Sequence, residues 1–279
     1  MSSINIISIL TLYELRRAVA RKRILLLIAL IFLTEAALYL ILTLLPANFI
    51  QPFKAYAWII GIIVPSTVLI HILALTIGAS TFSEEYEMGT ADFWLTRPMR
   101  RAEYFAGKVA GGLAFTALIV LTYSILSLLL SWWVFGPQSR LDLYLEAILT
   151  SIFSTITFLT LGLAAGELLR RSMLATIFGA AAFFASLIVE TYLGVVGALT
   201  GDQSLTGLTV YLPSWAASRL TTTIISNGLG AQAFIPLPPI ATQAADLGTA
   251  FLNIALYSTS FLALTLARLT FTDVTRRAT

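Results

Sequence analysis

The chain has 279 residues, of which 58% are hydrophobic and only 11% are charged. A soluble domain carries charge on about 25% of its residues, so this composition excludes an ordinary soluble domain and indicates a membrane protein. The net charge of +3 requires no nucleic-acid partner, because basic residues beside a membrane account for it, and the absence of cysteine excludes disulfides and thiolate metal sites.

The predicted elements begin with an amphipathic helix ahead of the first long apolar run. Its apolar residues recur at helical spacing: Ile6, Ile9, Leu10 and Tyr13. Glu14 and several bases supply the polar side, whereas Arg17 falls on the apolar side, where its stem can cover apolar surface. Residues 1–23 are therefore predicted to form a cytoplasmic interfacial helix that lies on the membrane lipid.

Six apolar runs follow, each close to 20 residues or longer. They occupy residues 24–45, 58–80, 107–134, 145–168, 173–196 and 247–267. Twenty residues form roughly 30 Å of helix, which is the thickness of the hydrocarbon core. Strands of a membrane barrel would alternate apolar and polar residues, and these runs do not. The sequence predicts an all-α integral membrane protein with six transmembrane helices.

The distribution of Lys and Arg predicts the orientation of these helices. With a cytoplasmic N-terminus, 14 of the 17 basic residues lie inside and three lie outside: Lys54, Arg140 and Arg219. Both termini are thus predicted to be cytoplasmic, in a multi-pass protein of the cell membrane. Residues 197–246 form the extracellular loop, either a solvated tether or a structured lid.

Two features of the extracellular loop predict local structure. Ser214, after a proline, is a candidate N-cap of a short helix, and Asn227-Gly228 is a candidate stop. The segment "PLPPI" at residues 236–240 is predicted to be extended.

A connector at residues 83–106 joins the second and third spans and is rich in charged and aromatic residues. Ser83, followed by two acids, is predicted to start a helical turn, and Gly89 permits a bend after it. Thr90 is predicted to cap a short helix from Ala91 to Arg97, which a proline ends. The connector is therefore predicted to hold a rigid cytoplasmic helix.

Two interpretations of this connector are open from its residue types. One is an aromatic belt at the level of the lipid headgroups. The other is a docking surface for a protein, which explains why acids, which anionic lipids repel, accompany the aromatic side chains.

The pattern Glu85-x-Glu87-x-Gly89-Thr90, followed by Leu95, Pro98, Arg101 and Lys108, resembles the cytoplasmic signature of type-2 ABC exporter permeases. The layout of an amphipathic helix, six spans and a large outer loop before the last span is similar too. The resemblance implies the permease subunit of an ATP-driven exporter, which forms the substrate pathway as a dimer with a second permease chain. It also implies two copies of a separate ABC ATPase subunit, which would hold the ATP and Mg.

In that family the connector is a coupling helix that seats in a cleft of the ATPase. The resemblance assigns ATPase docking to Glu84, Glu85, Glu87, Gly89, Thr90, Phe93, Trp94, Pro98 and Arg101. It makes the turn at Leu168–Ser172 a second, shorter contact.

The sequence contains no motif for chemistry of its own. A phosphate-binding G-x-x-x-x-G-K-[ST] loop is absent, since Gly107-Lys108 is followed by Val109. The single histidine excludes an H-E-x-x-H metalloprotease. The chain is therefore predicted to be no enzyme, and to bind no catalytic metal or cofactor itself.

Three ionisable residues fall inside predicted spans: Glu35, His71 and Glu190. Charges at this depth are costly, so these groups are candidates for the transport pathway or for an interface. The alternatives are a neutral His71 bound to a backbone carbonyl and a Glu190 that extends to the outer surface. Two other functions stay open: an ion-coupled carrier or channel that uses these three residues, and a membrane scaffold that transports nothing.

Two pairs of glycines are spaced for close helix contacts. They are Gly107 with Gly111, and Gly162 with Gly166. Each pair is predicted to mark a place where two helix backbones approach.

Overall fold

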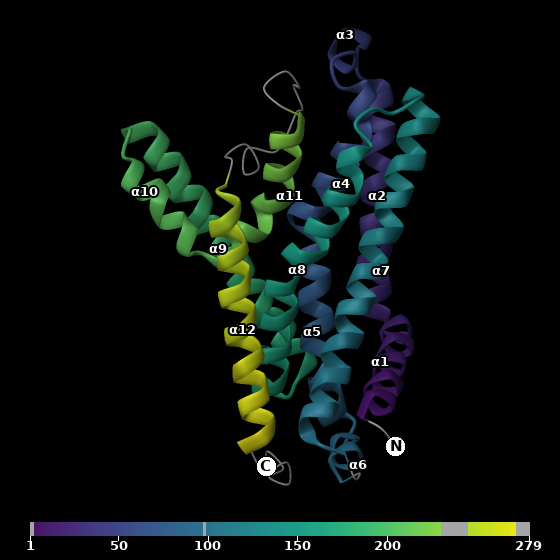
Figure 1. Cartoon of the computed structure of the whole chain (residues 1–279), viewed down its shortest axis with the longest axis vertical. Coiled ribbons are helices and arrows are strands. Elements are labelled where there is room, and N and C mark those ends of the chain that lie inside the picture. Colours follow the sequence, from purple (N-terminus) through teal and green to yellow (C-terminus); the bar gives the residue numbers. More distant parts are fainter. Residues whose placement is uncertain (1–2, 97–98, 230–244, 272–279) are drawn as a thin grey trace.

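The computed structural model describes residues 3–96, 99–229 and 245–271, which form helices and turns without a strand (Figure 1). The first half contains α1 Ser3–Ala20, α2 Lys22–Leu44, α3 Ala47–Ile50, η1 Lys54–Tyr56, α4 Ala57–Thr67, α5 Leu69–Glu87 and α6 Ala91–Leu95. The second half contains α7 Arg101–Phe135, α8 Asp142–Leu169, α9 Ser172–Thr200, α10 Gln203–Leu208, η2 Thr209–Tyr211, α11 Pro213–Leu229 and α12 Leu247–Phe271.

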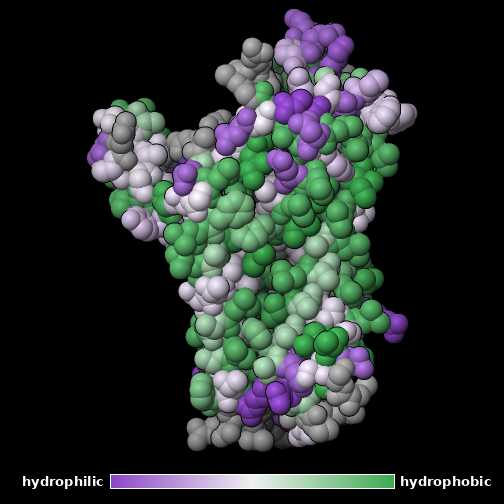
Figure 2. Space-filling view, viewed as in Figure 1, coloured by the Kyte–Doolittle hydropathy of each residue, from purple (hydrophilic) through white to green (hydrophobic). Residues whose placement is uncertain are grey.

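Five helices are long and apolar enough to cross a membrane: α2, α7, α8, α9 and α12. The segment Lys54–Thr67 and helix α5 qualify together, with a bend of 42° at Val68. Pro65 lies inside α4 just before this bend, and it removes one backbone hydrogen bond from the helix. Counted as one span, the bent pair makes six, so the predicted all-α membrane fold is confirmed. Figure 2 shows the matching apolar band between two more polar ends.

Helix α8 packs in the interior, against α5, α9, α11 and α12. Its approach to α5 depends on glycine, because a Cβ atom at Gly162 would lie 2.3 Å from the Leu75 carbonyl oxygen. At Gly166 a Cβ atom would lie 2.5 Å from the carbonyl oxygen of Ala79. The contact predicted for this glycine pair is confirmed, and its partner is α5.

The connector between the second and third spans differs from its predicted form at three places. Helix α6 ends at Leu95, before the predicted end at Arg97. Ser83 starts no helical turn: α5 continues without a break to Glu87, and the Ser83 hydroxyl donates to the carbonyl of Ala79 in the preceding turn. Thr90 precedes α6, but its side chain makes no capping hydrogen bond to that helix. Serine and threonine inside a helix can donate to the carbonyl of residue i−4, so Ser83 is satisfied within α5 without acting as a cap.

The segment at residues 197–246, which was predicted to be the extracellular loop, contains more helix in its described part than the sequence indicated. Helix α11 runs through the interior, against α8 and α12, and most of its first 11 residues are buried. Ser214 is its second residue rather than its N-cap, and α11 continues past Asn227-Gly228 to Leu229. The described part is thus a packed helix rather than a tether. The "PLPPI" prediction lies outside the described residues.

Candidate functional site

A buried charge cluster lies where α1, α5 and α7 meet, at the end of the bundle that carries α6 and is called the α6 end (Figure 1). Lys108 on α7 donates from Nζ to Glu14 Oε2 on α1 at 2.8 Å, and also to Glu85 on α5. Glu85 accepts a further hydrogen bond from the Tyr104 hydroxyl. The side chains of Glu14, Glu85 and Lys108 are at most 1% exposed, so these charges are removed from water.

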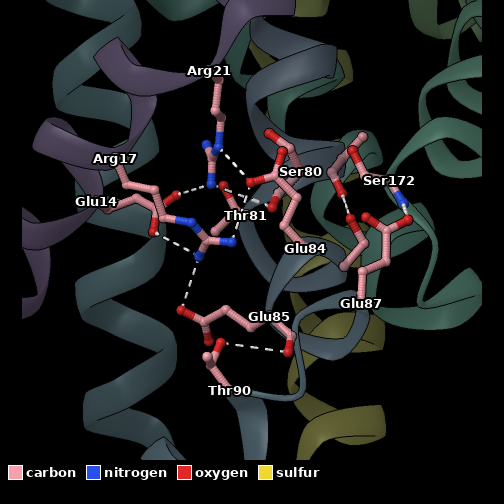
Figure 3. A network of polar contacts seen from close by, with 12 residues as sticks. Glu14, Arg17, Arg21, Ser80, Thr81, Glu84, Glu85, Glu87, Thr90 and Ser172 are labelled. Atoms are coloured by element: carbon pink, nitrogen blue, oxygen red, sulfur yellow. Dashed lines mark hydrogen bonds and ion pairs between the residues drawn. The ribbon is translucent and has the colours of Figure 1, made fainter.

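Two arginines of α1 and its junction with α2 complete the cluster (Figure 3). Arg17 donates to Glu85 Oε1 at 2.9 Å and to Glu84 Oε2 at 3.2 Å. Arg21 donates to the same Glu84 oxygen at 2.8 Å and to Glu14 Oε1 at 2.8 Å. Three carboxylates thus face three bases. Such balance is needed because a buried charge that loses its partner costs about 3–5 kcal/mol.

Glycine allows α1 to come close enough to α7 for these bonds. A Cβ atom at Gly107 would lie 2.5 Å from Leu10 Cβ, and one at Gly111 would lie 2.6 Å from Glu14 Cβ. This glycine pair therefore marks a close helix contact, as predicted. The buried face of α1 is centred on Leu10, Glu14 and Ala18, whereas Ile9 is half-exposed.

The electrostatics of Glu14 follow from this setting. Burial alone would raise the pKa of the Glu14 carboxyl. The positive charges of Lys108, Arg21 and Arg17 outweigh burial and hold the pKa below its ordinary value. Glu14 is therefore a charged member of the cluster near neutral pH.

Beyond the cluster, the chain turns sharply into α6. Gly89 adopts a φ of +67°, a left-handed conformation that favours glycine, and the Thr90 amide donates to the Glu85 carbonyl at 2.9 Å. Trp94 packs on the Tyr13 ring of α1, with ring centroids 5.1 Å apart. Phe93, which contacts Trp94 edge-on, remains 52% exposed. The two aromatic residues of α6 thus differ in their contacts: Trp94 packs on α1, whereas Phe93 is exposed.

The end of α5 also holds the turn between α8 and α9. The Glu87 carboxylate accepts a hydrogen bond from the Ser172 amide at 2.8 Å, at the start of α9 (Figure 3). Arg170 lies over the ring of Tyr86, 4.7 Å from its centroid, and the Tyr86 hydroxyl donates to Glu167 at 2.8 Å. The turn predicted as a second contact is therefore adjacent to the α5–α6 connector.

Arg101 connects the start of α7 to the end of α12. Its Nη1 donates to the carbonyl oxygens of Leu269 at 2.7 Å and Thr270 at 2.8 Å. A base at the end of a helix suits both the unpaired carbonyls and the negative end of the helix dipole. Pro98, the remaining predicted docking residue, lies outside the described residues.

Comparison with known families identifies the chain. A family described as ABC-2 family transporter protein matches residues 9–274. The chain belongs to the ABC-2 transporter family. It is a multi-pass membrane permease, and such permease domains typically lack an ATPase site. No curated protein matches the chain.

Glu35 of this permease lies on α2 beside Gly61 of α4 and Ser127 of α7. Its side chain is fully buried, and neither carboxylate oxygen makes a hydrogen bond to a described residue. A Cβ atom at Gly61 would lie 2.3 Å from Glu35 Oε1 and 2.1 Å from Ser127 Oγ, so a larger residue there would displace these two side chains. The Tyr39 hydroxyl next to it donates to the Ser127 carbonyl at 2.9 Å.

His71 and Glu190 lie elsewhere, and each contacts α11. His71 Nε2 bonds the Ala217 carbonyl at 3.2 Å, which agrees with the alternative of a histidine bound to backbone. Glu190 is 1% exposed and accepts from Arg219 Nε at 2.9 Å and from the Ser214 hydroxyl at 2.6 Å. The alternative that Glu190 extends to the outer surface is wrong, because α11 supplies a buried partner. The permease thus keeps its three intramembrane candidates apart.

Sequence reasoning missed Glu14, Arg21 and Tyr104 as members of the cluster. A signal for Glu14 was present, since it falls at helical spacing between Leu10 and Ala18, in the middle of the buried face. Arg21 carried no such signal, because its partners lie 63 residues away on α5 and seven residues away on α1.

Proposed function

We propose that this permease is the membrane subunit of an ATP-driven exporter in the cell membrane and that its α6 end faces the cytoplasm. It forms the substrate pathway as a dimer, and two copies of a separate ATPase subunit bind at the α6 ends. The ATPase supplies the sites for ATP and Mg. The excess of Lys and Arg in the segments at the α6 end of the bundle supports a cytoplasmic orientation of that end.

The exposed apolar surface at the α6 end is the observation that carries the proposal. Met88 is 59% exposed and Phe93 is 52% exposed, on the two sides of the Gly89 bend. Leu168 and Leu169, each 41% exposed, are the last residues of α8, next to the turn that packs beside α5. Exposed apolar side chains on neighbouring segments at a polar end of the molecule are typical of a protein-binding surface.

The other docking candidates would position this surface rather than contact the ATPase. Glu84 and Glu85 belong to the charge cluster, which fixes α5 to α1 and α7. Glu87 holds the start of α9, Arg101 holds the end of α12, and Trp94 attaches α6 to α1. Gly89 and Thr90 form the bend. If the ATPase displaced α6, these contacts would move several membrane helices together with it.

The intramembrane groups have different roles in this proposal. Glu35 is the candidate for the transport pathway or for a polar contact between the two permease chains, since its carboxylate has no hydrogen bond to a described residue. Glu190 and His71 instead hold α11 in the bundle.

Cysteine labelling and co-purification test this proposal. Thr96 and Ser204 are exposed, and the chain has no cysteine of its own, so Thr96→Cys and Ser204→Cys give single labels. In intact cells an impermeant thiol reagent should label position 204 and spare position 96. The permease purified from membranes should carry an ATPase chain at one copy per permease. Labelling of position 96 alone, or a permease that transports without any ATPase, would reject the proposal.

A further inference from the structure

A small pocket lies beside the charge cluster, where α2 and α9 begin. Its volume is 130 Å³. The polar residues that line it include Arg21, Lys22, Arg23, Ser80, Glu84 and Ser172. The volume is several times the roughly 30 Å³ that a water molecule occupies in the liquid, so a phosphate group fits.

Arg21 lines this pocket and carries hydrogen-bond donors at Nη1 that the protein does not use. Its side chain is 7% exposed; Nε bonds Glu84 and Nη2 bonds Glu14. Nη1 is buried and has no hydrogen-bond partner among the described residues. A buried donor without a partner costs about 1–3 kcal/mol, which an anionic ligand in the pocket would recover.

The start of α2 adds backbone donors to the same place. Lys22 is its first residue, and Arg21 before it makes no side-chain cap. The first amides of a helix lack intrahelical partners and carry the positive end of the helix dipole, so they favour an anion.

Arg23 and Ser172 join the pocket across the gap between α2 and α9. Arg23 Nη1 donates to Ser172 Oγ at 3.3 Å, and this hydroxyl donates its own hydrogen to no described residue. Glu84 is the acid among the described residues that line the pocket, and its Oε2 accepts from Arg17 and Arg21. Because Glu84 and Glu14 balance Arg21, the positive charge of the lining comes from Lys22 and Arg23.

The depth of the pocket indicates the source of the anion. Helix α2 has 23 apolar-rich residues and spans about 34 Å, close to the hydrocarbon thickness, so Lys22 lies at the level of the headgroups. We infer that the pocket binds the phosphate group of an anionic membrane lipid, through Arg21, Arg23, Ser172 and the first amides of α2. This site goes beyond the proposed function, because it requires no ATPase.

Native mass spectrometry of the detergent-solubilised permease tests the site. The protein is given equal amounts of phosphatidylglycerol and phosphatidylcholine, and the bound lipids are counted. We expect the permease to retain phosphatidylglycerol preferentially, and the double variant Lys22→Gln/Arg23→Gln to bind it about tenfold less. Arg16→Gln is the matched control, because Arg16 is an exposed base on α1 that does not line the pocket. It should change binding less than about twofold.

Two further measurements distinguish free phosphate from a lipid headgroup and give a result even if the double variant misfolds. If inorganic phosphate raises the unfolding temperature of the permease but not of the double variant, the pocket binds phosphate without lipid chains. If only the lipid does so, the headgroup is the ligand. Ser172→Ala removes one hydroxyl and should weaken retention even where the double variant fails to fold. Equal retention of both lipids, or an equal loss in Arg16→Gln, would overturn the inference.

Discussion

Lys108 on α7 and Glu14 on α1 form an ion pair of 2.8 Å across 94 positions of the sequence, and neither side chain is more than 1% exposed. The pair makes α1 part of the bundle rather than a separate surface helix. Because Lys108 also bonds Glu85, one ammonium group joins the first helix, the end of α5 and the start of α7.

Replacement of Lys108 should destabilise the permease strongly. Lys108→Met keeps much of the side-chain volume but leaves Glu14 and Glu85 with less positive charge, so we expect a loss of about 3–5 kcal/mol in the free energy of unfolding. Lys54→Met, at an exposed lysine, is the control and should change stability by less than about 0.5 kcal/mol. Thermal unfolding in detergent measures both. Equal unfolding temperatures for the two variants would mean that the cluster contributes little.

Neighbouring glycines on α7 should respond differently to alanine. In Gly111→Ala the new Cβ meets Glu14 Cβ at 2.6 Å, so α1 must move away and the permease should lose stability. In Gly112→Ala the nearest atom is Leu159 Cδ1 at 3.4 Å, which is an ordinary contact. Alanine favours the helix by up to about 1 kcal/mol over glycine, so Gly112→Ala should be neutral or stabilising. The same unfolding temperature for both variants would contradict the close approach of α1 and α7.

The sequence predicted the membrane helices well, because a long apolar run has few alternatives. Residues 107–134 and 145–168, for example, fall inside α7 and α8. Glycine pairs were also informative, because the spacing of Gly162 and Gly166 is typical of a helix face that another helix approaches closely. The identity of that neighbour, α5, depended on the three-dimensional fold.

Partners that are distant in the sequence could not be predicted in the same way. Glu84 and Glu85 suggested a surface for another protein, but the bases that pair with them lie on α1, at its junction with α2 and on α7: Arg17, Arg21 and Lys108. A short helix was predicted where α11 lies, but its burial was not. The burial depends on partners from other helices: Glu190 accepts from the Ser214 hydroxyl, and His71 bonds the Ala217 carbonyl.

The pair of Glu190 and Arg219 should hold α11 in place. Glu190→Gln removes the charge opposite Arg219 and should cost about 3–5 kcal/mol of stability, since Arg219 is 5% exposed. The double variant Glu190→Gln/Arg219→Gln should recover part of this loss, because no buried charge remains at the pair. Thermal unfolding of the single and double variants measures the interaction free energy between Glu190 and Arg219. If the losses simply add, the two side chains do not stabilise one another.

We propose that α6 seats the ATPase, and replacement of Phe93 tests this role most directly. Burial of a large aromatic side chain contributes on the order of 2–3 kcal/mol, so Phe93→Ala should weaken ATPase binding tenfold or more. Phe49→Ala is the matched control, because Phe49 is 48% exposed, contacts a neighbouring ring edge-on as Phe93 does, and lies at the opposite end of the bundle (Figure 1).

The measurement is the amount of ATPase recovered per permease chain, together with its ATP hydrolysis rate, when each variant is purified from membranes at equal expression. We expect loss of the ATPase with Phe93→Ala and full recovery with Phe49→Ala. Full recovery with Phe93→Ala, in a permease whose unfolding temperature is unchanged, would contradict the assignment of α6 as the docking helix.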